Sequence, residues 1–542
     1  MRGFLLCAAV VALLLLSTFT WRAADARAPL EGTHDGVLRV VLARGYDTLQ
    51  STRALLQRRK AAASSSTAAA AAPASAPLQG MLTPGAQPVP AAPPAAAAVA
   101  LHPPLAPSPA PFASIERTLL SIDFHISPIK DLTHLLKSSF PLVRVEDRSL
   151  SGACGRTGTC ATPQNLLVLR QGDVDNSMHF GGATRRAFFE AYKEQGPGGP
   201  LVLGSDAMVC SHPTGMCELA MPFNRSVVLW ATTRFEQGRE RHRERLAGYI
   251  TNFRALAALP GSVVLANNMY DVHYTHYFTG IKPRYVPSLC AYPDMRWSWR
   301  SAGSSTRTVL VHGYRPHRGG VALGAFLQPL LALSQAGRTG GFTFTELREA
   351  LGSDYAYSSL ASHPAILHLP YQVSIMSLFE HYRAGIPILA PSLPLLTSWH
   401  MQTLFVSERT WDTVLYNAPA SASVLPRHPQ AEQPYDPNDE HSEAAVAWWL
   451  QWADFYTLPH IILFDSWEHL AEQLRGLDLA AVSQRMLEHA ASMEAEALET
   501  WAGVLRGLPR HQDRAAQDAA LAGLGFEDRM DRIYGKGKWA EY

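Results

Sequence analysis

The sequence predicts an α/β protein with two Rossmann-like, doubly wound domains behind an N-terminal apolar segment and a disordered stem. From residue 114 onward, short apolar runs alternate with amphipathic stretches, as in parallel sheets covered by helices on both faces. A polar run at 301–307 divides these elements into two series. Residues 61–112 are mostly Ala, Pro and Ser, a composition that buries too little apolar surface to fold.

The N-terminal segment, residues 1–27, contains an uncharged apolar run at 4–19. Its length fits an uncleaved signal-anchor or a signal peptide, for which Ala24-Asp25-Ala26 offers a cleavage site. Either way the body lies in the secretory pathway. We expect a lumenal body held at the Golgi or endoplasmic reticulum membrane through this segment and the stem at 28–113, or a secreted protein if cleavage occurs.

The cysteines fit an oxidising compartment. Outside the apolar run, Cys154 and Cys160 form one close pair and Cys210 and Cys217 another, with Cys290 left over. These pairs predict two short disulfide loops, and five buried thiols are the alternative.

Charge and spacing disfavour two classes of partner. The chain has 47 basic and 46 acidic residues, a net charge of +1, and no basic stripe of the kind that nucleic-acid binding requires. The cysteines lack the CxxC pairs typical of zinc sites. Asn224-Arg225-Ser226 is a sequon for N-glycosylation.

The first domain is expected at residues 114–300. Its first strand is predicted at 118–126, and Pro128 stands where a helix begins. Further strands are predicted at 142–145, 166–169, 201–203, 227–231 and 263–266, and helices at 185–194 and 240–259.

The second domain is expected at residues 301–509. Strands are predicted at 308–312, 365–369, 386–389 and 461–464, and helices at 344–351, 374–384, 442–456, 466–474 and 479–508. The aromatic residues of the helix at 442–456 indicate core packing, with a sugar-stacking platform as the alternative. The polar tail, 510–542, is expected to be loose.

The stretch 363–392 carries the clearest functional signal. It reads as a buried strand, a helix that begins near Ser374 and a second buried strand. Ligands of open α/β sheets bind at the carboxyl ends of strands, where a helix N-terminus suits phosphate. Ser374 and Ser377 add hydroxyl groups in the first turn, and Glu380 follows on the same face as Ser377, within reach of ribose hydroxyls.

Glu380, followed by Gly385, Pro387 and an apolar strand, resembles the donor-site segment of GT-B glycosyltransferases. The resemblance implies a nucleotide-sugar as co-substrate, with Glu380 on its ribose and Ser374 and Ser377 on its diphosphate. Many retaining members carry a second Glu eight residues before the first, where this chain has Gln372. We assign Gln372 to the donor site on this resemblance.

The loop at 312–320 supports a donor site in the second domain. In GT-B proteins the matching loop often supplies a basic residue to the donor pyrophosphate, and this chain offers Arg315, His317 and Arg318. Arginine recognises phosphate in a bidentate manner. A solvated basic loop is the alternative.

The strand ends of the first domain supply the remaining candidates. Asp123 and His125 follow the first strand, so either can act as a general base on an acceptor hydroxyl or simply cap the strand end. Candidates for acceptor contact stand in loops or after other strands: His212, Arg234, Asn267, Asn268 and Asp271. Structural roles are the alternative for each of these.

Together these features predict transfer of a sugar from a nucleotide-sugar to a glycan or protein acceptor. No bound metal or other cofactor is expected, because basic side chains and a helix N-terminus can carry the leaving-group charge. Asp173-Val174-Asp175 has the spacing of a metal motif but lies in a polar loop. The alternatives are a sugar-nucleotide epimerase or hydrolase on the same scaffold, or an inactive glycan-binding ectodomain, which Gln372 makes credible.

Overall fold

The computed structural model describes residues 112–170, 180–237, 242–300, 306–316, 320–410 and 419–541. The apolar run at 4–19, almost all of the stem, Asp173, Asp175, His317 and Arg318 lie outside these ranges. Within them, the helices are all too short or too polar to cross a membrane.

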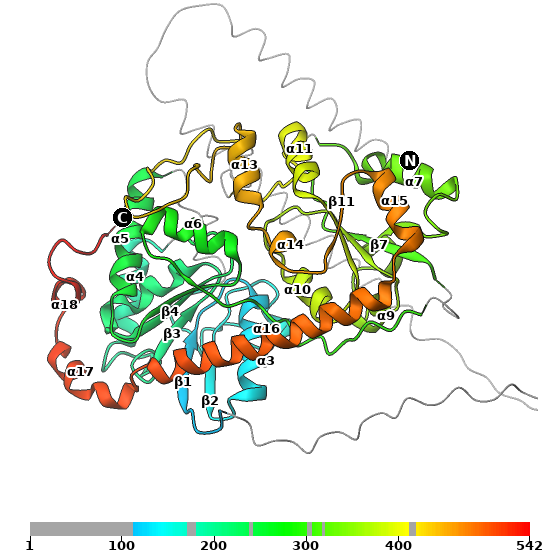
Figure 1. Cartoon of the computed structure of the whole chain (residues 1–542). Helices are drawn as coiled ribbons and strands as arrows, with labels where there is room; N and C mark the ends of the chain where they lie inside the picture. The colour runs from blue at the N-terminus through cyan, green and yellow to red at the C-terminus, as the bar shows by residue number, and fades with distance from the viewer. Residues whose placement is uncertain are drawn as a thin grey trace, which may run out of the picture. The chain divides into compact units, whose positions relative to one another are not determined.

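The first half of the described chain is built on a six-stranded parallel sheet of order β2-β1-β3-β4-β5-β6 (Figure 1). Its strands are β1 Arg117–Ser121, β2 Val143–Asp147, β3 Ala207–Cys210, β4 Ser226–Ala231, β5 Val263–Ala266 and β6 Arg284–Tyr285. The main helices are α3 Ile126–Ser139, α4 Gly182–Tyr192, η2 Thr214–Phe223, α5 Arg243–Ala257 and α6 Met269–Thr279. Strand β4 is buried along its whole length, as expected for a sheet covered on both faces. The strand order reverses between β1 and β3, which is where α/β sheets bind ligands.

The second half carries a five-stranded parallel sheet of order β11-β10-β9-β7-β8. Its strands are β7 Thr308–His312, β8 Thr343–Glu346, β9 Ile366–His368, β10 Ile388–Pro391 and β11 Ile462–Phe464. Its helices are α7 Leu323–Gln335, α8 Leu347–Leu351, α9 Tyr357–Ala361, α10 Met376–Arg383, α11 Leu393–Thr403, α13 Glu443–Leu450, α14 Asp454–Thr457 and α15 Trp467–Gly476. The order reverses between β7 and β9. The prediction of two doubly wound α/β sheets is confirmed.

Several predicted elements are wrong. The runs 166–169 and 201–203 pair with no described strand: the first is irregular backbone in which Leu167 is exposed, and the second is a turn. The third strand is β3 instead. The predicted helix at 344–351 is strand β8 followed by α8, which begins where Glu346 caps the backbone N–H of Glu349. The predicted helix at 442–456 is divided into α13 and α14 by the extended backbone of Ala453.

The long helix α16, Leu479–Gly507, packs on both halves (Figure 1). Its first part contacts α10 of the second half. Its last part covers the first sheet, where Trp501 meets Trp230 of β4 edge-on with ring centroids 5.6 Å apart. The predicted domain boundary at residue 509 therefore assigns to the second domain a helix that both domains share.

The tail after Arg510 is ordered as far as residue 541, so the expectation of a loose tail is wrong. It contains α17 Ala515–Leu521 and α18 Phe526–Tyr534. Phe526 packs on Phe189 with centroids 5.8 Å apart, and Asp518 pairs with the buried Arg225 at 2.7 Å. The tail is polar overall, but its few apolar side chains lie on one helix face and complete the first core.

Both short disulfide loops are present, Cys154–Cys160 and Cys210–Cys217, and Cys290 is a buried free thiol. This is the first of the two alternatives that the spacing allowed.

Candidate functional site

The first switch point brings Asp123 and Ser211 together from the ends of β1 and β3. The Ser211 hydroxyl donates to Asp123 Oδ2 at 2.5 Å, and the backbone N–H of His125 donates to Oδ1 at 2.5 Å. Asp123 is 1% exposed, and its burial raises the pKa of the carboxyl to about 8 despite these bonds. With both oxygens occupied and covered, Asp123 is a positioning residue for the loop that carries His125.

His125 and His212 lie side by side at the same edge of the sheet. Their ring centroids are 4.9 Å apart, and the His125 side chain is exposed. Desolvation by the surrounding protein lowers the pKa of His125 although part of its ring is exposed. Complete burial lowers the pKa of His212 further, with added repulsion from His125 and Arg234. Both imidazoles are therefore neutral near pH 7. Nδ1 of His125 accepts the N–H of Ser127 at 3.3 Å, which caps α3.

Three histidines converge behind the second switch point. His312 ends β7, and its Nε2 is bonded to Ser377 Oγ at 2.9 Å. His368 ends β9, and its Nε2 is bonded to Nδ1 of His381 on α10 at 2.8 Å. Burial lowers the pKa of all three, that of His312 to about 4. The three rings are thus neutral, and they are not arranged as metal ligands: within the described ranges no group of three such side chains can hold an ion.

The start of α10 is partly closed. Ser374 is 7% exposed and its neighbours Val373 and Ile375 are buried. The N–H of Asp454 donates to Val373 O at 3.0 Å, and burial raises the pKa of the Asp454 carboxyl well above its usual range, although Ser374 and Arg234 oppose the rise. The structure therefore places Ser374 against a buried acid. Ser377, which is half-buried, is the more accessible of the two predicted phosphate contacts.

Glu380 lies where the two halves meet. Its Oε1 accepts hydrogen bonds from the hydroxyls of Tyr292 at 2.5 Å and Tyr357 at 3.4 Å. Lys130 of α3 holds its Nζ 4.2 Å from the centroid of the Tyr292 ring. Burial raises the pKa of Glu380, and these partners and Lys130 lower it. Glu380 also lines a cavity of about 360 Å³ between the interdomain linker, α10 and α16.

Arg315 and Gln372 are brought together by Glu408, which sequence reasoning missed. Arg315 NH1 lies 3.0 Å from Glu408 Oε1, and Gln372 Nε2 donates to Glu408 Oε2 at 2.5 Å. The Arg315 guanidinium also stacks 3.9 Å from the centroid of Tyr371. Its side chain is 55% exposed, so this ion pair is screened and weak. A phosphate can compete with Glu408 for Arg315.

The predicted acceptor contacts after β4 and β5 are buried. Arg234, Asn267, Asn268 and Asp271 are each at most 1% exposed. Asn268 caps α6, accepting the N–H of Asp271 at 2.7 Å and donating Nδ2 to its Oδ2 at 2.7 Å. Asn267 donates to Ser288 Oγ at 3.1 Å. In this arrangement the three polar side chains of Asn267, Asn268 and Asp271 bond to groups of the protein itself, and an acceptor glycan cannot reach them.

The carboxyl ends of the two sheets face each other. Arg234, which follows β4, lies close enough to lower the pKa values of both His212 and Asp454. His212 belongs to the switch point of the first sheet, and Asp454 lies at the start of α10. Aromatic contacts join the halves nearby, where Trp449 of α13 meets Tyr270 of α6 with centroids 5.3 Å apart. The prediction of core packing for the aromatic helix is confirmed at Trp449, which is fully buried.

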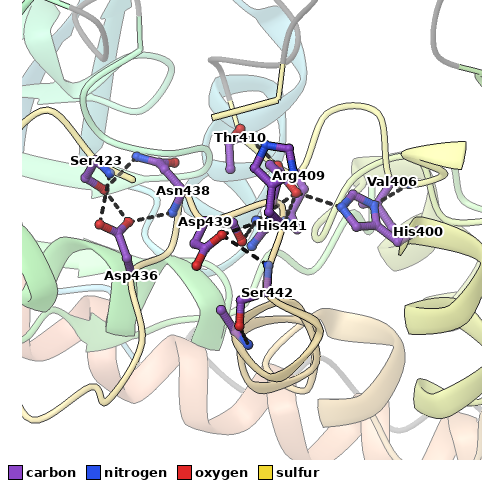
Figure 2. A network of polar contacts seen from close by, with 12 residues as sticks. His400, Val406, Arg409, Thr410, Ser423, Asp436, Asn438, Asp439, His441 and Ser442 are labelled. Carbon is purple, nitrogen blue, oxygen red and sulfur yellow. Dashed lines mark hydrogen bonds and ion pairs between the residues drawn. The ribbon is translucent and has the colours of Figure 1, made fainter. Parts of the chain in front are cut away.

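A buried polar network joins α11 to described residues on the chain between α11 and α13 (Figure 2). Glu440 accepts hydrogen bonds from His400 Nε2 at 2.6 Å, Arg409 Nε at 2.9 Å and Thr410 Oγ1 at 3.2 Å. The N–H of Val406 donates to His400 Nδ1 at 3.2 Å, so the proton of a neutral His400 is on Nε2 and points to Glu440. Burial favours a raised pKa for Glu440, but Arg409 and His400 bring it down to about 2.

Several solved structures are similar to this chain at low identity. They include the calicheamicin glycosyltransferase CalG4 (13% identity, 72% of this chain and 98% of that chain, TM-score 0.36) and Arabidopsis thaliana UGT89C1 complexed with UDP (11%, 72% and 100%, TM-score 0.36). Another is the spinosyn rhamnosyltransferase SpnG complexed with thymidine diphosphate (12%, 74% and 99%, TM-score 0.27). No protein-family model and no curated protein matches the chain. These TM-scores are too low to support an inference, so the fold assignment rests on the strand orders above.

Besides Glu408, four further site residues had no signal in the sequence. Ser211 follows Cys210 at the end of β3, a segment that the sequence predicted to be a loop. Lys130 lies on the polar side of α3, which the sequence pattern indicates to be exposed to solvent. Tyr292 and Tyr357 meet Glu380 from segments 88 and 23 residues away, a separation that local patterns cannot report.

Proposed function

We propose that the protein transfers a sugar from a nucleotide-sugar donor to a hydroxyl group of a glycan or glycoprotein. One observation carries the proposal: α3 and α10 begin at the two facing switch points and come together at Lys130, Tyr292 and Glu380. This is the position at which a two-sheet protein presents a carboxylate to ribose and strand-end groups to the reacting sugar.

The proposed roles follow from the contacts. Glu380 exchanges its tyrosine hydroxyl partners for ribose hydroxyls. Lys130, Arg315 and Ser377 offset the charge that develops on the departing nucleoside diphosphate. His125 accepts the proton of the acceptor hydroxyl on its Nε2. This role requires the neutral tautomer that carries its proton on Nδ1. In that tautomer Nδ1 no longer accepts the 3.3 Å hydrogen bond from the N–H of Ser127. The acceptor oxygen then bonds to the anomeric carbon as the bond from that carbon to the phosphate oxygen breaks.

We further propose that this reaction needs no bound metal and takes place in the Golgi or endoplasmic reticulum lumen, with the protein held by its N-terminal segment or secreted. The two disulfide loops support an oxidising compartment. Basic side chains at the site support metal-independent charge stabilisation.

The test is turnover of labelled UDP-, GDP- and CMP-sugars with a mixed glycan acceptor pool. We expect one donor to be consumed and activity to survive EDTA. Glu380→Gln should reduce kcat/KM at least tenfold, since a carboxylate bond to a hydroxyl contributes roughly 1.5–3 kcal/mol. The matched control is Glu499→Gln, which removes an exposed carboxylate on α16.

Two results would count against these proposals. Manganese-dependent recovery after EDTA contradicts the metal-free mechanism, and equal activity of the Glu380 variant and its control contradicts the donor site. A second candidate, a glycan-binding protein without transfer, is favoured by Ser374 lying against Asp454 and by Arg315 pairing with Glu408. Acceptor binding with no nucleotide-sugar binding would select it.

A further inference from the structure

A continuous trough runs beside α16, starting at Glu380. The cavity that Glu380 lines adjoins a second one of about 690 Å³, and the two share Arg296, Gln484 and Leu487. We call the two together the α16 trough. It extends from the proposed donor site across the linker between the two sheets.

The end of the α16 trough far from Glu380 is strongly basic. Its lining includes Arg296, Arg300, Arg307 and Arg475, all exposed. Arg307 is held in place, with its guanidinium 4.4 Å from the centroid of Phe342 and NH2 bonded to Gly340 O at 2.9 Å.

Among the described residues that line this end, Asp478 is the one acid. Its carboxylate is already engaged, because Oδ1 accepts the N–H groups of Ala480 and Ala481 at 3.0 Å each and so caps α16. Arg475 also lies 3.9 Å from the exposed Glu472, which is outside the lining. Four arginines against one lining carboxylate leave this end with a positive balance that suits anionic groups on a ligand.

The end near Glu380 has the opposite character. Three carboxylates line it, those of Asp294, Glu380 and Glu488, together with Arg383 and the shared Arg296. Arg383 is paired with Glu494 at 2.5 Å. Carboxylates accept hydrogen bonds from hydroxyl groups but repel anions. The trough therefore suits a ligand with hydroxyls at one end and anionic groups at the other.

We propose that the α16 trough binds a saccharide chain that carries sulfate or carboxylate groups, and that this chain is the acceptor. The acceptor role rests on the proposed function, whereas the binding does not. A nucleic acid fits less well, because its regular phosphates would meet the carboxylates around Glu380, and the chain as a whole has a net charge of only +1.

The experiment is isothermal titration calorimetry of the full chain, without donor, against three hexasaccharides. One is heparin-derived and sulfated, one is oligogalacturonate, and one is neutral maltohexaose. We expect at least one anionic oligosaccharide to bind with an affinity that falls as salt rises, and the neutral one not to bind. The double variant Arg300→Gln/Arg475→Gln should weaken binding by roughly tenfold, as loss of about 1.4 kcal/mol implies.

The matched control is Arg485→Gln/Arg532→Gln, which removes the same charge from exposed positions of α16 and α18 outside the trough lining and should leave affinity within twofold. Unchanged melting temperatures exclude misfolding of either variant. The proposal is overturned if neither anionic hexasaccharide binds, if both double variants weaken binding equally, or if a single-stranded RNA oligomer binds as tightly through the same arginines. Binding of an anionic saccharide without any nucleotide-sugar turnover would contradict the transferase proposal but support the proposal that the α16 trough binds such a saccharide.

Discussion

At the scale of single residues, the site depends on groups held in uncharged forms. Asp123 keeps a raised pKa because burial outweighs the hydrogen bonds from Ser211 and His125. His312, His368 and His381 stay neutral for the same reason. Under the proposed function, these neutral groups leave the basic side chains of the site as the charges that face a departing diphosphate.

The Asp123 carboxyl should make stability depend on pH. Its folded pKa of about 8 lies above the unfolded value of 3.8, so the folded state holds the extra proton between these values. Stability from this group is therefore full below about pH 4 and falls as pH rises toward 8, by about 1.4 kcal/mol per pH unit. Asp123→Asn should remove this pH dependence, so the variant should gain more free energy of unfolding over wild type at pH 8 than at pH 5. Urea denaturation of both proteins at both pH values measures this gain. An equal gain at pH 5 and pH 8 would contradict the assigned protonation of Asp123.

At the scale of elements, α16 is the piece that the two sheets share. Its N-terminal half packs on α10, which carries Glu380, and its C-terminal half covers the first sheet through Trp501. The helix thus forms one wall of the α16 trough and contacts the helix that carries the donor-site candidate Glu380.

Removal of the Trp501 side chain should lower the free energy of unfolding. Trp501 is 1% exposed, and large-to-small changes at such positions cost about 3–5 kcal/mol. Trp501→Ala should lower the free energy of unfolding by that amount in chemical denaturation, whereas Glu499→Ala, two residues earlier and exposed, should change it by less than about 0.5 kcal/mol. A comparable loss in both variants would contradict the assignment of this stability to the Trp501 contact with the first sheet.

Sequence patterns predicted the repetitive part of this fold well. Strands β4, β5 and β7 were found because each is a buried apolar run, and α16 because its apolar stripe continues for eight turns. Strand β3 was missed because Ala207–Cys210 is short and less apolar than the runs beside it that form turns. At the site, strand-end reasoning predicted Asp123 and His125 after the first strand, whereas His212, which lies beside His125, was predicted only as a loop residue. It did not reveal that Ser374 lies against Asp454, because that contact joins residues 80 positions apart in the sequence.

At the scale of the whole molecule, the chain ends by returning to its first sheet. Asp518 meets both terminal nitrogens of Arg225, at 2.8 and 2.7 Å, and Arg225 is 1% exposed. Ala540 exchanges two backbone hydrogen bonds with the side chain of Asn252. The described residues after Arg510 therefore belong to the first domain, which is discontinuous in sequence.

Asp518→Asn should show how much this return contributes. The change leaves a buried guanidinium without its counter-charge, which costs about 3 kcal/mol. The exposed Asp513→Asn is its control and should be neutral. Thermal unfolding followed by circular dichroism compares the two, and identical melting temperatures would show that the tail adds little to the first domain.

The path of α16 also limits how the molecule can move. The helix packs at each end on a different half, and between Ala490 and Ala497 its side chains are largely exposed. Separation of the two sheets would require either bending of the helix in this exposed stretch or loss of the contact between Trp501 and Trp230. Opening of the molecule by a large substrate would therefore be opposed by the bending stiffness of one helix.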